Sequence, residues 1–198
     1  MPNVFTPVEF EPTTHQYRVG GLVLPSVTQI LKACGITRDY GPDPTARERG
    51  TYVHKMVAAD IYGDLDDKAL APEWLGWLES WRKAKRMLQI RDFLAVERIY
   101  GAVARGFAGT VDLIYGNGLA LPTICDFKTG EEEDWHKLQL AGYLRLVGVS
   151  HYRQNIYLRA DGKLPKMTMH KSSARDLCDW DAIFRTFQLQ HKGGTHAR

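Results

Sequence analysis

The chain has 198 residues, of which 44% are hydrophobic, and a formal net charge of +3. This composition excludes a disordered chain, and the length fits one ordinary domain. No apolar run is long enough to cross a bilayer, and the N-terminal sequence lacks the pattern of a secretory signal. We therefore expect a cytoplasmic protein without a membrane partner, folded as a single domain over residues 1–198 with a flexible tail at 191–198.

The first half of the chain predicts one hairpin followed by three helices. In chain order we expect the hairpin at 15–26 and the helices at 26–35, within 41–63 and at 72–89. Ser26 and Gln29 have the spacing of a capping box, which fixes the start of the first helix. Trp74, Trp77 and Trp81 recur at helical spacing in the third helix. We expect two of these tryptophans to be buried and one to lie near the surface.

The second half of the chain changes to a β pattern. Its segments are rich in β-branched and aromatic residues and are separated by Gly, Asn and Pro. We expect strands at 93–101, 110–116, 121–127, 152–160 and 165–170, and helices at 133–149 and 173–190. This order predicts an α/β fold with a mixed central sheet and helices on both of its faces.

Two aspartates and a lysine interrupt strands that otherwise look buried. Asp112 lies inside one apolar segment, and Asp126 and Lys128 end the next. Because side chains alternate along a strand, Asp126 and Lys128 point to the same side. The Gly-Asn-Gly turn lets the two strands pair, so the three groups can converge. The alternative is a structural salt bridge at a strand end.

Convergent carboxylates repel each other, and a hard divalent cation removes that repulsion. Mg²⁺ or Mn²⁺, as one or two ions, prefers such oxygen ligands, lowers the pKa of a bound water and stabilises charge on a phosphate. A lysine beside the ion can position that water or neutralise the transition state. The three side chains therefore predict phosphodiester hydrolysis.

The arrangement resembles the PD-(D/E)xK nuclease superfamily, most closely its RecB-type and phage exonuclease branch. That pattern has an acidic residue on one strand, (D/E)-x-K on the next, Gln-xxx-Tyr on the following helix and a histidine on an upstream helix. The matching residues are Asp112 in GTVD, Asp126 and Lys128 in DFKTG, Gln139 and Tyr143 in QLAGY, and His54 in RGTYVH. Val111 stands where the superfamily's name has Pro. The resemblance spans the chain from LPSVTQIL to YLRA.

The resemblance implies a restriction-endonuclease-like core with the N-terminal helices over the active cleft. The implied metal ligands are His54, Asp112, Asp126 and the backbone carbonyl of Phe127. Lys128 would act on the nucleophilic water. Gln139 would orient Lys128 or the scissile strand, and Tyr143 would support the site or contact DNA.

Further residues are candidates for contacts with DNA. Thr110 and Thr129 flank the acidic positions, and their hydroxyls could hold phosphate oxygens. Arg49 lies five residues before His54 on the same helix and could bind the backbone phosphate, a contact that gives affinity without reading sequence.

Three more residues are weighed against ordinary structural roles. Glu97 is either an extra acidic residue near the metal or a strand-surface glutamate. Trp81 and Arg82 belong to a row of aromatic and cationic residues that could grip a single strand, or they are part of a core helix face. The segment 81–91 has five Lys/Arg and no acidic residue, and residues 153–198 have nine Lys/Arg against four Asp/Glu. Such basic stretches suit a polyanion or a solvated helix face.

We expect a metal-dependent DNA exonuclease that functions in recombination, repair or phage DNA processing, in the host cytoplasm if it is phage-encoded. Its partners would be single- or double-stranded DNA ends and a recombination or single-strand-binding protein. Three scattered cysteines argue against an iron–sulfur cluster, and the lack of a P-loop argues against a nucleotide. The alternatives are an endonuclease of the same fold and a catalytically inactive nucleic-acid-binding module.

Overall fold

The computed structural model describes residues 8–37, 44–148, 151–171 and 174–191. Its strands are β1 (Val8–Glu11), β2 (Gln16–Val19), β3 (Leu22–Leu24), β4 (Asp92–Ala102), β5 (Phe107–Gly116), β6 (Thr123–Lys128), β7 (Tyr152–Tyr157) and β8 (Lys166–His170). Its helices are α1 (Val27–Ala33), α2 (Pro44–Tyr62), α3 (Pro72–Met87), the 3₁₀ turn η1 (Val103–Arg105), α4 (His136–Val147) and α5 (Ala174–His191).

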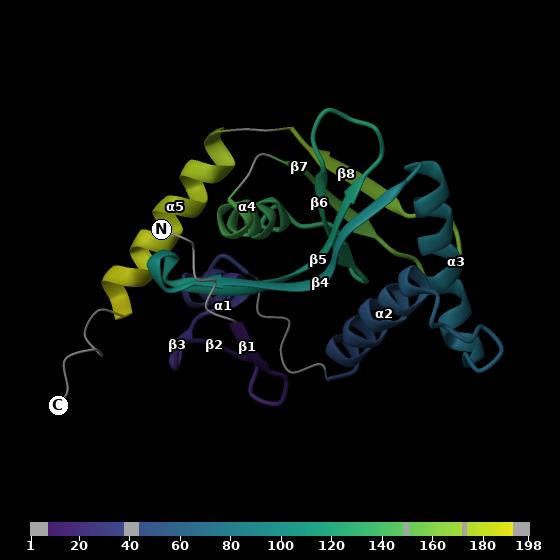
Figure 1. Ribbon diagram of the computed structural model, residues 1–198, viewed down its shortest axis with the longest axis horizontal. Helices are drawn as coiled ribbons and strands as arrows, with labels where there is room; N and C mark the ends of the chain where they lie inside the picture. The colour runs from purple at the N-terminus through teal and green to yellow at the C-terminus, as the bar shows by residue number, and fades with distance from the viewer. Residues whose placement is uncertain (1–7, 38–43, 149–150, 172–173, 192–198) are drawn as a thin grey trace.

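The strands form two sheets (Figure 1). The smaller sheet has the order β1-β2-β3 and is antiparallel. The larger sheet has the order β4-β5-β6-β7-β8, in which β6 and β7 are parallel and every other neighbouring pair is antiparallel. The larger sheet is therefore mixed, as the sequence predicts.

Helices flank the larger sheet as two separate groups (Figure 1). Helices α1, α4 and α5 share one hydrophobic cluster with the sheet, and α2 and α3 share another. Ile124 of β6 belongs to the first cluster and Phe127 of the same strand to the second. This division follows from the alternation of side chains along a strand. The general prediction of an α/β fold with a mixed sheet and flanking helices is confirmed.

The N-terminal region differs from the prediction by one strand. The predicted hairpin forms β2 and β3, and β1 adds to it because Val8 to Glu11 pair with β2. Four residues are too few for their alternation to be distinguished from a loop in the sequence. The capping box of α1 is present, with Gln29 N–H bonded to Ser26 Oγ at 3.1 Å and Ser26 N–H bonded to Gln29 Oε1 at 2.8 Å.

Several predicted boundaries move by a few residues. β5 begins at Phe107 rather than 110, α4 begins at His136 rather than 133, and β7 ends at Tyr157 rather than 160. Element ends depend on tertiary hydrogen bonds, which local patterns do not contain. The predicted tail lies outside the described residues except for His191, which ends α5.

Helix α3 carries the three tryptophans. Trp77 and Trp81 are buried and Trp74 is half-buried, so the prediction of two buried rings and one nearer the surface is confirmed. Gly76 of this helix lies against the loop after β7, where an added Cβ would come within 1.7 Å of the Ala160 carbonyl oxygen. Among the described helices, none has both the length and the apolar content needed to span a membrane.

One row of polar residues crosses the larger sheet. Asp112 of β5 and Glu97 of β4 lie between the paired residues Val96–Leu113 and Arg98–Val111, and Asp126 of β6 follows Cys125, which pairs with Leu113. Asp126 lies beside Asn155 of β7, which in turn pairs with Thr168 of β8. Residues at the same register position share a face of the sheet. The fold thus gathers three carboxylates that are far apart in sequence.

Candidate active site

A cluster of potential metal ligands lies where α2 meets β4 and β5. His54 Nδ1 is 3.6 Å from Glu97 Oε1 and 3.5 Å from Asp112 Oδ2. One ligand atom from each residue lies within 4.8 Å of the other two. His54 Nε2 lies 3.1 Å from the carbonyl oxygen of Phe127. One imidazole and two carboxylates form a ligand set that suits Mg²⁺ or Mn²⁺. The Phe127 carbonyl lies at the other ring nitrogen of His54, so its binding of a metal stays a prediction.

Asp112 lies just beyond the last pair of residues that joins β5 to β6. That pair is Leu113 and Cys125. Beyond them, Asp112 Oδ2 accepts a hydrogen bond from the N–H of Phe127 at 2.8 Å. Burial raises the pKa of Asp112, and the Asp126 and Glu97 carboxylates add to this rise against the opposing charge of His54.

The pKa of His54 reflects the negative charge of its surroundings. Burial by itself lowers the pKa of this imidazole, but the carboxylates of Asp112 and Glu97 outweigh burial and raise the pKa to about 9. The folded protein therefore holds a proton among these three groups at neutral pH. A divalent cation would compensate the same negative charge once the histidine is neutral. The ligand types and their charge fit such an ion.

Lys128 is fixed beside this cluster by two partners. Its Nζ lies 2.8 Å from Asp126 Oδ2 and donates to Gln139 Oε1 at 2.7 Å. Gln139 Nε2 in turn donates to the hydroxyl of Tyr143 at 2.9 Å. Gln139 and Tyr143 are one turn apart on α4, so both face the sheet. Lys128 faces Asp126, as the sequence argument requires, and the Asp126 carboxylate is near enough to Asp112 to raise its pKa.

Asp126 contacts Lys128 and is not one of the three residues of the cluster. Its Oδ2 atom accepts hydrogen bonds from Lys128 and, at 2.9 Å, from Asn155 Nδ2. The group of close ligand atoms contains His54, Glu97 and Asp112 without Asp126. The direct binding of a metal by Asp126 stays a prediction. Glu97, weighed in the sequence as an optional acid, is in the cluster.

The backbone of Glu97 is unusual for a strand residue. Its φ angle is +46°, in the left-handed region that side-chain-bearing residues rarely adopt. Such conformations cost about 1–3 kcal/mol and occur at functional sites more often than elsewhere. Neither the strain nor the contact with His54 is visible in the sequence AVERIY.

The residues predicted to bind phosphate differ in whether their polar groups already have hydrogen-bond partners. Thr110 is bonded through its hydroxyl to the Tyr17 hydroxyl at 2.9 Å. Thr129 lies beside Gly50 of α2, where an added Cβ would be 3.7 Å from its Oγ1. Arg49, the residue before Gly50, has its Nε buried without a hydrogen-bond partner and its guanidinium carbon 6.0 Å from the centre of the Trp77 ring.

Two side chains considered for contact with DNA lie in the core. Trp81 has no exposed surface, packs against Phe127, and donates its indole N–H to Asp60 Oδ2 at 2.8 Å. Tyr143 is only 6% exposed, so of its two proposed roles only support of the site agrees with the structure. For both residues the burial agrees with the structural alternative, which is a core position for Trp81 and support of the site for Tyr143.

Arg82 is already neutralised by acidic side chains. Its guanidinium donates to Asp60 Oδ1 at 2.8 Å and to both oxygens of Asp67, at 2.6 and 2.9 Å. These bonds argue against the predicted contact with DNA. They instead join α3 to α2 and to the loop between the two helices.

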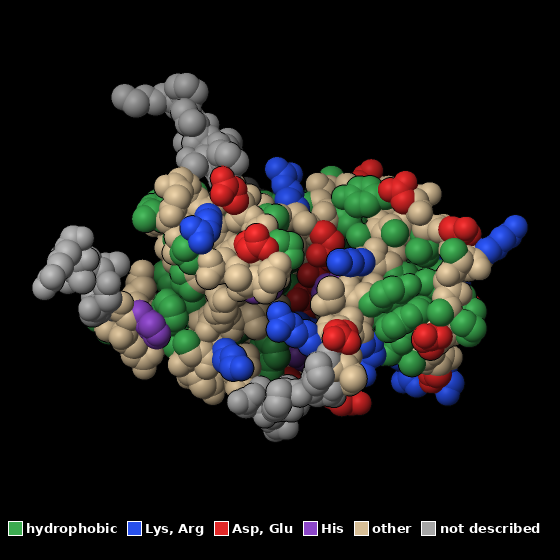
Figure 2. Space-filling view, turned by 90° about the horizontal axis from the view of Figure 1, so that it is seen from below, with side chains coloured by type: hydrophobic (Ala, Val, Ile, Leu, Met, Phe, Trp, Pro, Cys, Tyr) green, Lys and Arg blue, Asp and Glu red, His purple; other side chains and the backbone are tan. Residues whose placement is uncertain are grey.

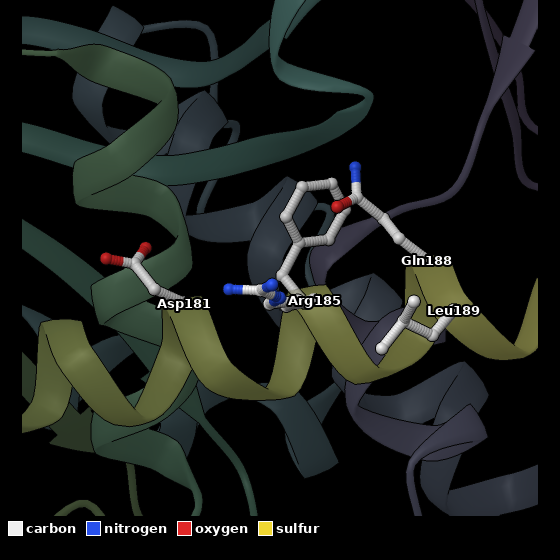
Figure 3. Close-up of a pocket in the computed structure, with 5 residues that line it drawn as sticks. Asp181, Arg185, Gln188 and Leu189 are labelled. Atoms are coloured by element: carbon white, nitrogen blue, oxygen red, sulfur yellow. The ribbon is translucent and has the colours of Figure 1, made fainter.

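A recess with acidic side chains and a hollow along α5 are lined by different kinds of side chain. Figure 2 shows a recess that holds acidic and histidine side chains, with Lys and Arg on the surfaces that border it. A separate hollow of about 290 Å³ lies along α5 (Figure 3) and is lined by Asp181, Phe184, Arg185, Gln188 and Leu189. Asp181 is paired with Arg145 of α4. The α5 hollow therefore has no set of ligands or nucleophiles comparable with the cluster around His54.

Sequence reasoning missed two polar residues next to the site. Asn155 on β7 is fully buried and bonds Asp126, and His170 on β8 bonds Asn155 at 2.7 Å. An asparagine inside the predicted strand YRQNIYL is a signal of a buried polar contact. Its partner could not be named without the register of β6 and β7.

Comparison with known proteins adds little to this description. No protein-family model and no curated protein matches the sequence. Fifteen chains of solved structures match. One of them, titled "Crystal structure of SSO0001", is 13% identical, with a TM-score of 0.37 over 83% of this chain and 84% of that one. A likeness this distant carries no argument about activity.

Proposed function

We propose that the chain is a metal-dependent nuclease of the PD-(D/E)xK type, with the restriction-endonuclease-like core that this implies. The proposal rests on Lys128, whose ammonium is held between Asp126 and Gln139 beside the cluster of His54, Glu97 and Asp112. A buried salt bridge would need one acid and one base. Three carboxylates near one lysine and one histidine are more than such a bridge requires.

The metal ligands and Lys128 have different roles in the proposed reaction. His54, Glu97, Asp112 and the Phe127 carbonyl would hold Mg²⁺ or Mn²⁺, together with Asp126. When bound, the cation supplies a water of lowered pKa and neutralises charge on the phosphate. Lys128 holds the attacking water in line or stabilises the phosphate as negative charge develops on it. Gln139 and Tyr143 keep the lysine in that position.

In the proposed complex, phosphate contacts would extend from the cluster toward α2. Arg49 has an unpartnered buried Nε, and Thr129 lies next to the turn of helix that carries Arg49 and Gly50. A phosphate oxygen could accept the Nε–H of Arg49. Contacts of this kind bind any DNA sequence, which suits an exonuclease that acts on DNA ends in recombination, repair or phage DNA processing.

Cleavage of linear and covalently closed DNA tests this proposal. Each substrate is incubated with Mg²⁺, Mn²⁺ or EDTA and with the wild type, Lys128→Ala or Lys163→Ala. Lys163 is an exposed lysine, so its variant is a matched control. We expect loss of linear DNA only, abolished by EDTA, slowed about 100-fold or more by Lys128→Ala and unchanged in the control.

Other outcomes separate the alternatives. Cleavage of closed circles would indicate an endonuclease with the same site. A salt-sensitive gel shift with no cleavage by the wild type would indicate an inactive binding module. Equal cleavage by Lys128→Ala and wild type would contradict the proposed reaction.

A further inference from the structure

Asn155 of β7 bridges Asp126 of β6 to His170 of β8. Its Nδ2 donates to Asp126 Oδ2 at 2.9 Å, and its Oδ1 lies 2.7 Å from Nε2 of His170. The asparagine has no exposed surface, and its register position is beside Asp126 in the parallel pair β6–β7. The bridge is thus built by the sheet and does not depend on a loop.

The direction of these hydrogen bonds follows from their chemistry. A carboxylate only accepts, so the amide nitrogen of Asn155 must face Asp126 and the amide oxygen must face His170. The amide oxygen only accepts as well, so Nε2 of His170 must carry a proton. His170 therefore selects one of the two orientations of the amide. The reverse orientation would place two oxygens against each other.

The bridge has a consequence for Asp126. Asn155 and Lys128 both bond Oδ2 of this carboxylate. Within the described part of the chain, these bonds leave Oδ1 as the oxygen available to a cation. With Asn155 removed, Lys128 alone would hold Asp126, and the carboxylate could rotate toward the ammonium.

We propose that Asn155, oriented by His170, is a positioning residue that fixes the Asp126 carboxylate for binding of the divalent cation. This inference rests on the proposed function, because it assigns Asp126 to the metal site. Residues that orient metal ligands typically change metal affinity or activity 10- to 100-fold when they are mutated.

The test measures Mn²⁺ affinity by calorimetry and the Mn²⁺ concentration for half-maximal DNA cleavage. The variants are Asn155→Ala, His170→Ala and His170→Gln, in which the glutamine amide retains a donor near the place of Nε2. Asn117→Ala and His191→Ala are matched controls, because Asn117 bonds Leu88 and His191 bonds Phe187, both outside the site. Thermal melts verify folding, which His170 variants should keep because this side chain is only half-buried.

We expect both alanine variants to weaken Mn²⁺ binding about tenfold or more, with a matching shift in the activity curve. His170→Gln should lie within about threefold of the wild type, as should the controls. Wild-type Mn²⁺ affinity in folded His170→Ala, or equal losses in His170→Gln and His170→Ala, would overturn the inference. Mn²⁺ binding without cleavage by the wild type would instead overturn the nuclease proposal, and calorimetry would still decide the role of Asn155.

Discussion

Two charged regions of this protein stand out equally in the sequence. In the structure they differ in how far their charges are paired with charges of opposite sign. In the basic segment 81–91, three of the five cations have acidic partners, since Arg82 bonds Asp60 and Asp67, Lys83 lies 3.2 Å from Glu79, and Lys85 lies 3.8 Å from Asp60. The acidic row on the larger sheet has more carboxylates than cations. Charge that is compensated within the fold holds elements together. Buried charge that the fold leaves uncompensated has to be balanced in another way, here by a bound proton or, in the proposed function, by a divalent cation.

The largest expected effect is on the acidic row. Asp112→Asn keeps the shape of the side chain but removes a charged ligand, so DNA cleavage should fall about a thousandfold, equivalent to several kcal/mol. The measurement is the initial rate of cleavage with saturating Mn²⁺. Asp67→Asn, which changes an exposed acid of the α3 region, is the control and should cleave at the wild-type rate. A fall of less than tenfold in Asp112→Asn would count against a role as metal ligand.

The next effect concerns the packing of α3 and not its charge. Gly76→Ala places a methyl group 1.7 Å from the Ala160 carbonyl oxygen, so the backbone must move. We expect the free energy of unfolding to fall by about 3 kcal/mol in urea denaturation. Gly130→Ala, where the added methyl meets no neighbour within 4 Å, should change it little. Equal stability of the two variants would show that the helix adjusts without cost.

The protonated cluster predicts how stability depends on pH in the absence of metal. The folded-state pKa of His54 is raised to about 9, and the pKa of Asp112 is also raised, so the folded protein binds more protons than the unfolded chain. The contribution of His54 is complete below about pH 6.5 and is lost as the pH rises through 9. We expect the free energy of unfolding in EDTA to fall by about 2 kcal/mol between pH 6 and pH 9.

The control for this pH dependence is His54→Gln, in which the decrease above pH 6.5 should be smaller. Saturating Mn²⁺ should reverse the trend, because metal binding requires deprotonated ligands and is tighter at high pH. A stability in EDTA that is constant from pH 6 to pH 9 would contradict the shared proton.

The smallest effect compares two arginines directly. Arg49→Ala should weaken DNA binding a few-fold and reduce the salt dependence of binding by about one phosphate contact. Arg82→Ala should leave both unchanged and lower the free energy of unfolding by about 1 kcal/mol, since this pair is partly screened by solvent. Binding measured by fluorescence anisotropy over a range of salt distinguishes them. A larger loss of binding in Arg82→Ala would show that its ion pairs exchange for phosphate.

The sequence by itself determined the order of helices and strands from β2 onward and placed Asp126 and Lys128 on the same side of one strand. These features depend on local periodicity, caps and alternation, which neighbouring residues encode. Tertiary structure decided that Glu97 joins His54, that Trp81 is core and that Asn155 holds Asp126. Those outcomes depend on strand register and helix packing between segments far apart in the chain, and no local pattern carries that information.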